Sequence, residues 1–97
     1  MQSTKAFSYL GFAIKSRKVV FGTDSIVEYK KKMYLIVVSE LLAQNAQDKI
    51  VRRAEQHQIK VKVLADSEFT QLVPKNGCKA IAITSAELAK ALLGELE

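Results

Sequence analysis

The chain has 97 residues, of which 48% are hydrophobic and 26% are charged, and this length fits one globular domain with no room for a second independent core. No apolar run approaches the ~18 residues of a membrane span, and residues 1–5 lack the basic-then-apolar layout of a secretion signal, so we expect no membrane partner. Because Cys78 is the only cysteine, an internal disulfide is excluded, and we expect a reducing, cytoplasmic setting.

The positive charge of the chain is unevenly placed. Fifteen basic and ten acidic residues give a formal net charge of +5. Residues 1–34 carry seven basic and two acidic side chains, residues 35–64 carry five and three, and residues 65–97 carry three and five. A positive field concentrated in the first third favours a polyanionic partner, most often a nucleic acid. An ordinary basic surface that only aids solubility explains these charge counts about equally well.

The spacing of apolar residues predicts alternating helices and strands. The helices are expected at 4–16, from 23–25 to about 32, at 46–57, as a short helix or turn at 66–72, and from 84 to 93. The strands are expected at 19–21, 34–38, 61–64 and 80–83. Continuous apolar strands of this kind are buried on both faces. The fold class is therefore predicted to be α/β, a three-layer α/β/α sandwich around a four-stranded mixed sheet.

Short polar motifs predict where helices and loops begin. The runs Ser25–Glu28 and Thr84–Glu87 each match a capping box, in which a hydroxyl accepts a hydrogen bond from a backbone amide and the glutamate reaches back. Asn45 can cap the third long helix. The run Val73–Gly77 contains Pro, Asn and Gly and is the strongest loop signal in the chain.

Residue types that carry catalysis do not form a recognisable constellation. His57 is the only histidine, and we interpret it as a solvated residue at a helix end, because no partner for a general base can be named. Cys78 is better explained as a small apolar side chain than as a reactive thiol. Capping and helix-dipole interactions account for Asp24 and Glu28. With no Cys/His cluster at ligand spacing, we expect no catalytic residue, no metal and no cofactor.

A binding surface is better supported by the sequence than an active site. The strand at 19–21 ends at Gly22, and the helix that follows starts with free backbone amides that can donate to phosphates or base edges. Lys15, Arg17 and Lys18 precede this turn, and the lysine run 30–32 follows it. Basic groups around an open helix start predict a nucleic-acid surface, although a solvated helix end also explains the lysine run.

The first helix and strand carry a motif that resembles a known family. The segment Leu10–Gly22 (LGFAIKSRKVVFG) resembles the opening of the small ribosomal L-seven-Ae/L-thirty-e superfamily, especially its bacterial YlxQ and YbxF type. Members typically read Leu-Gly, a small or apolar residue, Ala, a basic residue, an Ala/Ser-Gly or Ser-Arg step, and Lys-(Leu/Val)-Val-x-Gly. Later segments agree in order, at 34–39, 45–59, 61–64 and 80–84.

The resemblance implies an α/β/α sandwich that binds RNA, in many members a kink-turn. In that family the strand-to-helix turn carries Gly-x-Asn-Glu-x-x-Lys and reaches sheared G·A pairs, and a loop before the last strand packs against nucleotides flipped from the bulge. Carried over to this chain, the turn is Gly22–Ser25, supported by Arg17 and Lys18, and the loop is Val73–Gly77.

Three positions of the turn depart from the family pattern. Asp24, Ser25 and Glu28 stand where the family has Asn, Glu and Lys. A carboxylate accepts hydrogen bonds but cannot donate them, and two carboxylates place negative charge where phosphates approach. These departures separate this turn from the kink-turn motif of the family.

Together these patterns predict a non-catalytic, cytoplasmic RNA-binding protein, associated with the ribosome, that recognises structured, kink-turn-like RNA through a helix N-terminus and a basic surface. We expect a monomer whose partners are RNA and ribosomal proteins. The expected RNA contacts are Lys15, Arg17, Lys18, Gly22, Thr23, Asp24, Ser25, Lys31, Lys32, Pro74, Lys75 and Asn76. One alternative is a protein-interaction module on the same fold that uses Leu41, Leu42 and the acidic turn. Another is an enzyme that uses Cys78 or His57.

Overall fold

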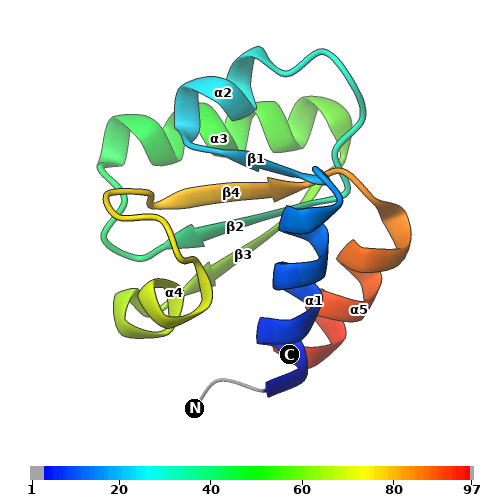
Figure 1. The fold of residues 1–97 in the computed structure, drawn as a ribbon. Coiled ribbons are helices and arrows are strands. Elements are labelled where there is room, and N and C mark those ends of the chain that lie inside the picture. The colour runs from blue at the N-terminus through cyan, green and yellow to red at the C-terminus, as the bar shows by residue number, and fades with distance from the viewer. Residues whose placement is uncertain (1–3, 97) are drawn as a thin grey trace.

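The computed structural model describes residues 4–96 and arranges five helices around a four-stranded sheet within that range (Figure 1). The helices are α1 (Thr4–Lys15), α2 (Thr23–Glu28), α3 (Gln44–His57), α4 (Asp66–Leu72) and α5 (Ala86–Leu96). The strands are β1 (Val19–Phe21), β2 (Leu35–Ser39), β3 (Lys60–Leu64) and β4 (Ala80–Ile83). The predicted order of elements is confirmed, with shifts of a few residues at their ends.

The strands lie in the order β1-β4-β2-β3. β4 pairs antiparallel with both β1 and β2, whereas β2 and β3 are parallel, so the sheet is mixed, as predicted. The two central strands are buried at every position, because helices cover both of their faces. Their continuous apolar sequences agree with that burial.

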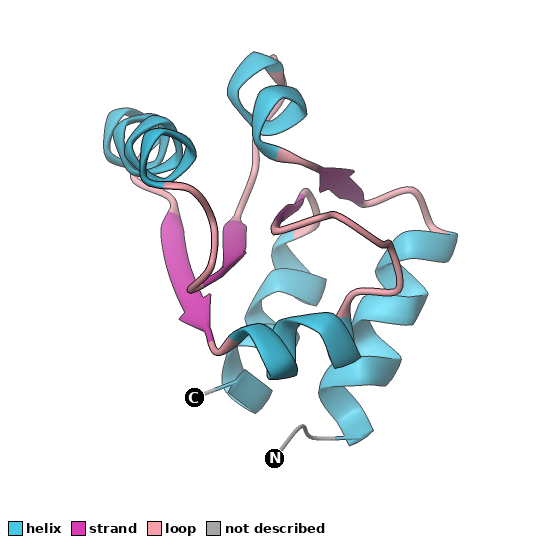
Figure 2. Ribbon diagram, turned by 90° about the vertical axis from the view of Figure 1, so that its left-hand side faces the viewer, coloured by secondary structure: helices cyan, strands magenta, loops and turns pink. Residues whose placement is uncertain are grey.

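Two hydrophobic cores separate the sheet from its two helix layers. Successive side chains of β2 alternate between them, with Leu35 and Val37 in one core and Ile36 and Val38 in the other. Helices α1, α4 and α5 pack on the first core, and α2 and α3 on the second. Figure 2 shows α2 and α3 together on one side of the strands. The predicted three-layer α/β/α sandwich is thus confirmed.

Helix α2 is shorter than predicted and is not capped by Ser25. It ends at Glu28, and the lysine run 30–32 lies in the loop that leads to β2. The N-cap is Gly22, and no side chain accepts a capping hydrogen bond there. The glycine lets the chain turn from strand to helix within one residue, which leaves Ser25 inside the first helical turn, where it cannot act as a cap.

The two other helices with predicted caps, α3 and α5, also start differently from their sequence motifs. Helix α3 begins one residue before Asn45, with Ala43 at the N-cap and no side-chain capping bond. At α5 the Oγ atom of Ser85 accepts a hydrogen bond of 3.4 Å from the amide of Leu88. A capping hydroxyl is therefore present at α5, but it comes from Ser85 and not from Thr84. No helix within residues 4–96 is long and apolar enough to cross a bilayer.

Candidate nucleic-acid interface

The predicted turn is a glycine bend between β1 and α2. The Gly22 amide donates a 2.9 Å hydrogen bond to the carbonyl of Ala80, which fixes the bend to the start of β4. Its backbone has φ 91° and ψ 150°, a conformation that glycine adopts far more easily than other residues. No atom of a residue other than Gly22 and its two chain neighbours lies within 4 Å of the place where a Cβ would be, and Asp24 and Ser25 are exposed. The bend is therefore open to a ligand.

The second predicted loop lies directly beside this bend. Phe21, Gly22 and the loop residues 75–78 line one cavity of about 250 Å³. The Lys75 Nζ atom lies 4.9 Å from the centroid of the Phe21 ring, within the range of a cation–π contact. The two segments that the family resemblance assigns to RNA contact thus meet. We call residues 22–25 and 74–77 the turn–loop edge.

The basic residues before β1 do not join the turn–loop edge. Lys15, Arg17 and Lys18 are exposed, and the Lys18 carbonyl accepts a 2.8 Å hydrogen bond from the amide of Thr84, which follows β4. The glycine bend is paired with the other end of β4. Strand β1 separates the two groups, and three residues of strand span roughly 10 Å. The expectation that these cations surround the bend is therefore corrected.

The lysine run also lies at the far end of the sheet from the bend. The Tyr34 amide donates a 2.8 Å hydrogen bond to the carbonyl of Ile83, so the loop before β2 is held near the end of β4. The Nζ atom of Lys32 lies 5.3 Å from the centroid of the Tyr34 ring, and Lys31 is exposed. The predicted RNA contacts thus form two groups, one at each end of the sheet.

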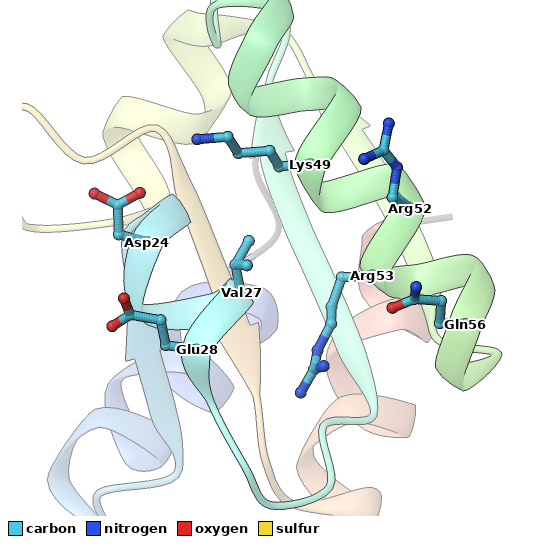
Figure 3. A pocket seen from close by; sticks show the side chains of 7 residues that line it. All are labelled: Asp24, Val27, Glu28, Lys49, Arg52, Arg53 and Gln56. Atoms are coloured by element: carbon cyan, nitrogen blue, oxygen red, sulfur yellow. The ribbon is translucent and has the colours of Figure 1, made fainter.

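Helix α3 carries cations that were not predicted as site residues. A cavity of about 360 Å³ lies between α2 and α3, and Figure 3 shows the side chains that line it. Its lining residues are Asp24, Val27, Glu28, Lys49, Arg52, Arg53 and Gln56. In Figure 3 the Lys49 side chain extends from α3 toward α2. The spacing of Lys49, Arg52, Arg53 and Gln56 places them on one helix face, which is the sequence signal that could have identified them.

This hollow continues to the lysine run. A second cavity, of about 280 Å³, is lined by Lys30, Lys31, Lys32, Met33, Arg53, His57 and Ile59. A third, between the first two, is lined by Val27, Glu28, Lys30 and Arg53. Since Arg53 lines all three cavities, they form one continuous surface. We call it the α2–α3 groove, and we call the cavity around the lysine run its basic pocket.

Arg53 lies half-buried at the centre of the groove. Its guanidinium donates a hydrogen bond to the carbonyl of Tyr29, which ties the segment after α2 to helix α3. Its Nε atom is buried and has no hydrogen-bond partner, and no other side-chain nitrogen or oxygen of the described residues has both properties. An unpaired buried donor on a charged group costs free energy. The bond to Tyr29 holds Arg53 in place, while part of its hydrogen-bonding capacity stays unused.

The remaining residues considered from the sequence lie apart from one another. His57 is exposed at the basic pocket, whereas the Cys78 Sγ atom lies 3.1 Å from the Ala80 carbonyl that it can donate to. Leu42 is buried in the core beside α3, while Leu41 is 64% exposed, so these two leucines do not form one patch. In the described part of the chain, no three His, Cys, Asp or Glu side chains gather into a group that could hold a metal ion.

Comparisons with known proteins bear on the fold. A scan against protein-family models finds no match, and a search of curated proteins finds none. The chain is similar to a solved structure from Bacillus halodurans, described as a protein with unknown function, with a TM-score of 0.83 and 21% sequence identity. The alignment covers 97% of this chain and 98% of the other. At this identity the likeness shows that the two proteins share a fold over almost their whole length.

Proposed function

We propose that this chain is a non-catalytic RNA-binding protein of the ribosomal L-seven-Ae/L-thirty-e type, associated with the ribosome in the cytoplasm. The observation that carries the proposal is the meeting of the glycine bend with the loop before β4 around one cavity. These are the two segments that the family resemblance assigns to RNA, although more than fifty positions separate their starts in the sequence. Antiparallel pairing of β1 with β4 places the end of β1 beside the start of β4, so one ligand can contact both segments.

The turn–loop edge offers the groups that structured RNA requires. The amides of the first turn of α2 lack intrahelical acceptors and can donate to phosphates or base edges. Lys75 and Asn76 are exposed beside them and add a cation and an amide. The Phe21 ring, half-buried at the cavity wall, is a surface on which an unpaired base can stack, as in RNA recognition at bulges and loops.

The acidic residues of α2 limit which RNA groups can approach. Asp24 and Glu28 are exposed and repel phosphates. A carboxylate accepts hydrogen bonds from base amino groups, so Asp24 favours an exposed base edge over a backbone phosphate. We therefore expect the RNA to present unpaired or sheared bases at the bend, as a kink-turn does, with the backbone held elsewhere.

Binding of labelled RNA to the whole chain tests the proposal. A kink-turn RNA and a straight duplex of matched length are titrated at about 50 mM and about 200 mM salt. We expect tighter binding of the kinked RNA and a steep loss of affinity with salt, because each neutralised phosphate releases counterions. Absence of binding to both RNAs at the lower salt would refute the proposal.

The exposure of Leu41 favours a second candidate, a protein-interaction module on the same fold. This side chain is 64% exposed beside the buried Leu42, and an exposed leucine adds apolar area to a contact. A pull-down of ribosomal proteins before and after nuclease digestion separates the two functions. Retention of the same proteins after digestion, and its loss in a Leu41→Ser variant, favours the protein-interaction module.

A further inference from the structure

We propose that the α2–α3 groove is a second RNA contact, in which the basic pocket holds backbone phosphates while the turn–loop edge holds bases. The proposal rests on the proposed RNA-binding function, but it uses a different surface and mostly different residues. It assigns a role to Lys49, Arg52 and Arg53, none of which was expected at the RNA site, and places Lys30 in the same groove.

The charge of the groove is the first reason. Six Lys or Arg side chains and two acidic side chains line it, a formal excess of four positive charges: Lys30, Lys31, Lys32, Lys49, Arg52 and Arg53 against Asp24 and Glu28. The whole chain has an excess of five. The acidic residues lie on the α2 side, and none of the described residues that line the basic pocket is acidic. A concave surface with one sign of charge concentrates counter-ions of the opposite sign.

The state of Arg53 is the second reason. Its guanidinium has donors to spare, because one nitrogen donates to Tyr29 and the Nε atom has no acceptor. Arginine presents a planar fork of donors that matches the oxygens of a phosphate. Arg53 lines the adjoining pocket, so the guanidinium donors that the Tyr29 bond leaves unused can serve a phosphate there.

The course of the groove is the third reason. Asp24 lines its first cavity and belongs to the turn–loop edge, whereas Lys31 and Lys32 line the pocket at the other end of the sheet. The groove therefore joins the two groups of predicted RNA contacts across the α2–α3 layer. An RNA whose bases contact the bend can place its backbone along the groove without leaving the protein surface.

Neutralising single groove residues tests this inference on the full chain. Lys30→Gln and Lys49→Gln each remove one exposed charge, and Lys90→Gln is the matched control on α5, on the opposite face. When the salt concentration rises from about 50 to about 200 mM, each phosphate contact adds about a threefold loss of affinity. A variant that lacks one contact should therefore lose about threefold less affinity than the unaltered chain. We expect that reduction for Lys30→Gln and Lys49→Gln and none for Lys90→Gln. Glu28→Gln removes a negative charge from the groove, so it should tighten RNA binding at low salt.

Backbone amide NMR shifts during titration with the same kink-turn RNA give an independent readout. We expect shifts at 30–33 and 49–57 in addition to those at the turn–loop edge. RNA binding with shifts confined to 22–25 and 75–78, and with Lys30→Gln and Lys49→Gln equal to Lys90→Gln, would overturn the groove and leave the proposed function standing. Failure of the unaltered chain to bind RNA would overturn both.

Discussion

The Lys75 Nζ atom lies 4.9 Å from the centroid of the Phe21 ring, and this contact joins the loop before β4 to the end of β1. Both residues line the cavity beside the glycine bend. The ammonium group occupies the ring face on which an RNA base would stack. A base that stacks there must displace Lys75, which is then free to contact a phosphate.

Replacing Phe21 by leucine tests whether a base stacks at this cavity. Stacking on an aromatic ring contributes about 1–3 kcal/mol per base, so Phe21→Leu should weaken the binding of kinked RNA by that amount in a filter-binding titration. Tyr34→Leu is the control, because Tyr34 carries a similar lysine contact at the other end of the sheet. Equal losses for the two variants would count against stacking at the turn–loop edge.

Replacing Asp24 by asparagine tests whether the glycine bend distinguishes a kink-turn from a straight duplex. The change removes one repulsive charge and introduces the amide found at this position in the family that the sequence resembles, so we expect binding tighter by up to about 1 kcal/mol, roughly fivefold. The gain should be larger for a kink-turn than for a straight duplex. Glu87→Gln, which neutralises an exposed first-turn acid of α5, is the control. An equal gain for both RNAs would show that this turn does not recognise the kink.

Replacing Gly22 by alanine tests the backbone of the bend. A residue with a Cβ is strained at φ 91° and ψ 150°, and we expect a loss of about 1–3 kcal/mol in the free energy of unfolding, measured by urea denaturation. The loss comes from the backbone alone, because nothing lies within 4 Å of the new Cβ. Gly11→Ala, inside α1 with equally open surroundings, should instead raise stability by up to about 1 kcal/mol. Loss of stability in both variants would refute this explanation.

Asp66 gives the protein a pH-dependent contribution to its stability. Its Oδ1 atom accepts hydrogen bonds of 2.7 Å from both Lys79 and Ser39. These bonds, chiefly the one from Lys79, hold the pKa of the Asp66 carboxyl below its ordinary value. For a carboxyl with a lowered pKa, the stabilisation is present above the unfolded pKa, about 3.9, and disappears as the pH falls through the folded pKa.

We therefore expect the urea midpoint to fall as the pH is lowered from about 5 to about 2, and to fall less in Asp66→Asn than in the unaltered chain. Asp48→Asn, on the exposed surface of α3, controls for the loss of one carboxylate. Parallel pH profiles for the unaltered chain and Asp66→Asn would contradict the assignment.

Local sequence was sufficient to predict the elements of this fold. The apolar runs that became β2 and β4 were identified because burial on both faces requires apolar residues at every position. The bend at Gly22 and the loop at 73–77 were identified because their backbone conformations select glycine, proline and asparagine. Capping motifs predicted less well, since Ser25 matched the pattern and became a residue of the first helical turn.

Which surface residues come together was decided only by the tertiary structure. Because β4 pairs antiparallel with β1, the Gly22 bend lies at one end of β4 and Lys18 at the other. This strand pairing could not be predicted from any local sequence pattern. Because α3 packs beside α2 on one face of the sheet, Arg53 lies next to the lysine run. In the sequence the two are separated by twenty residues, and nothing there indicates that they meet. Local interactions determine the elements, and long-range packing determines their neighbours.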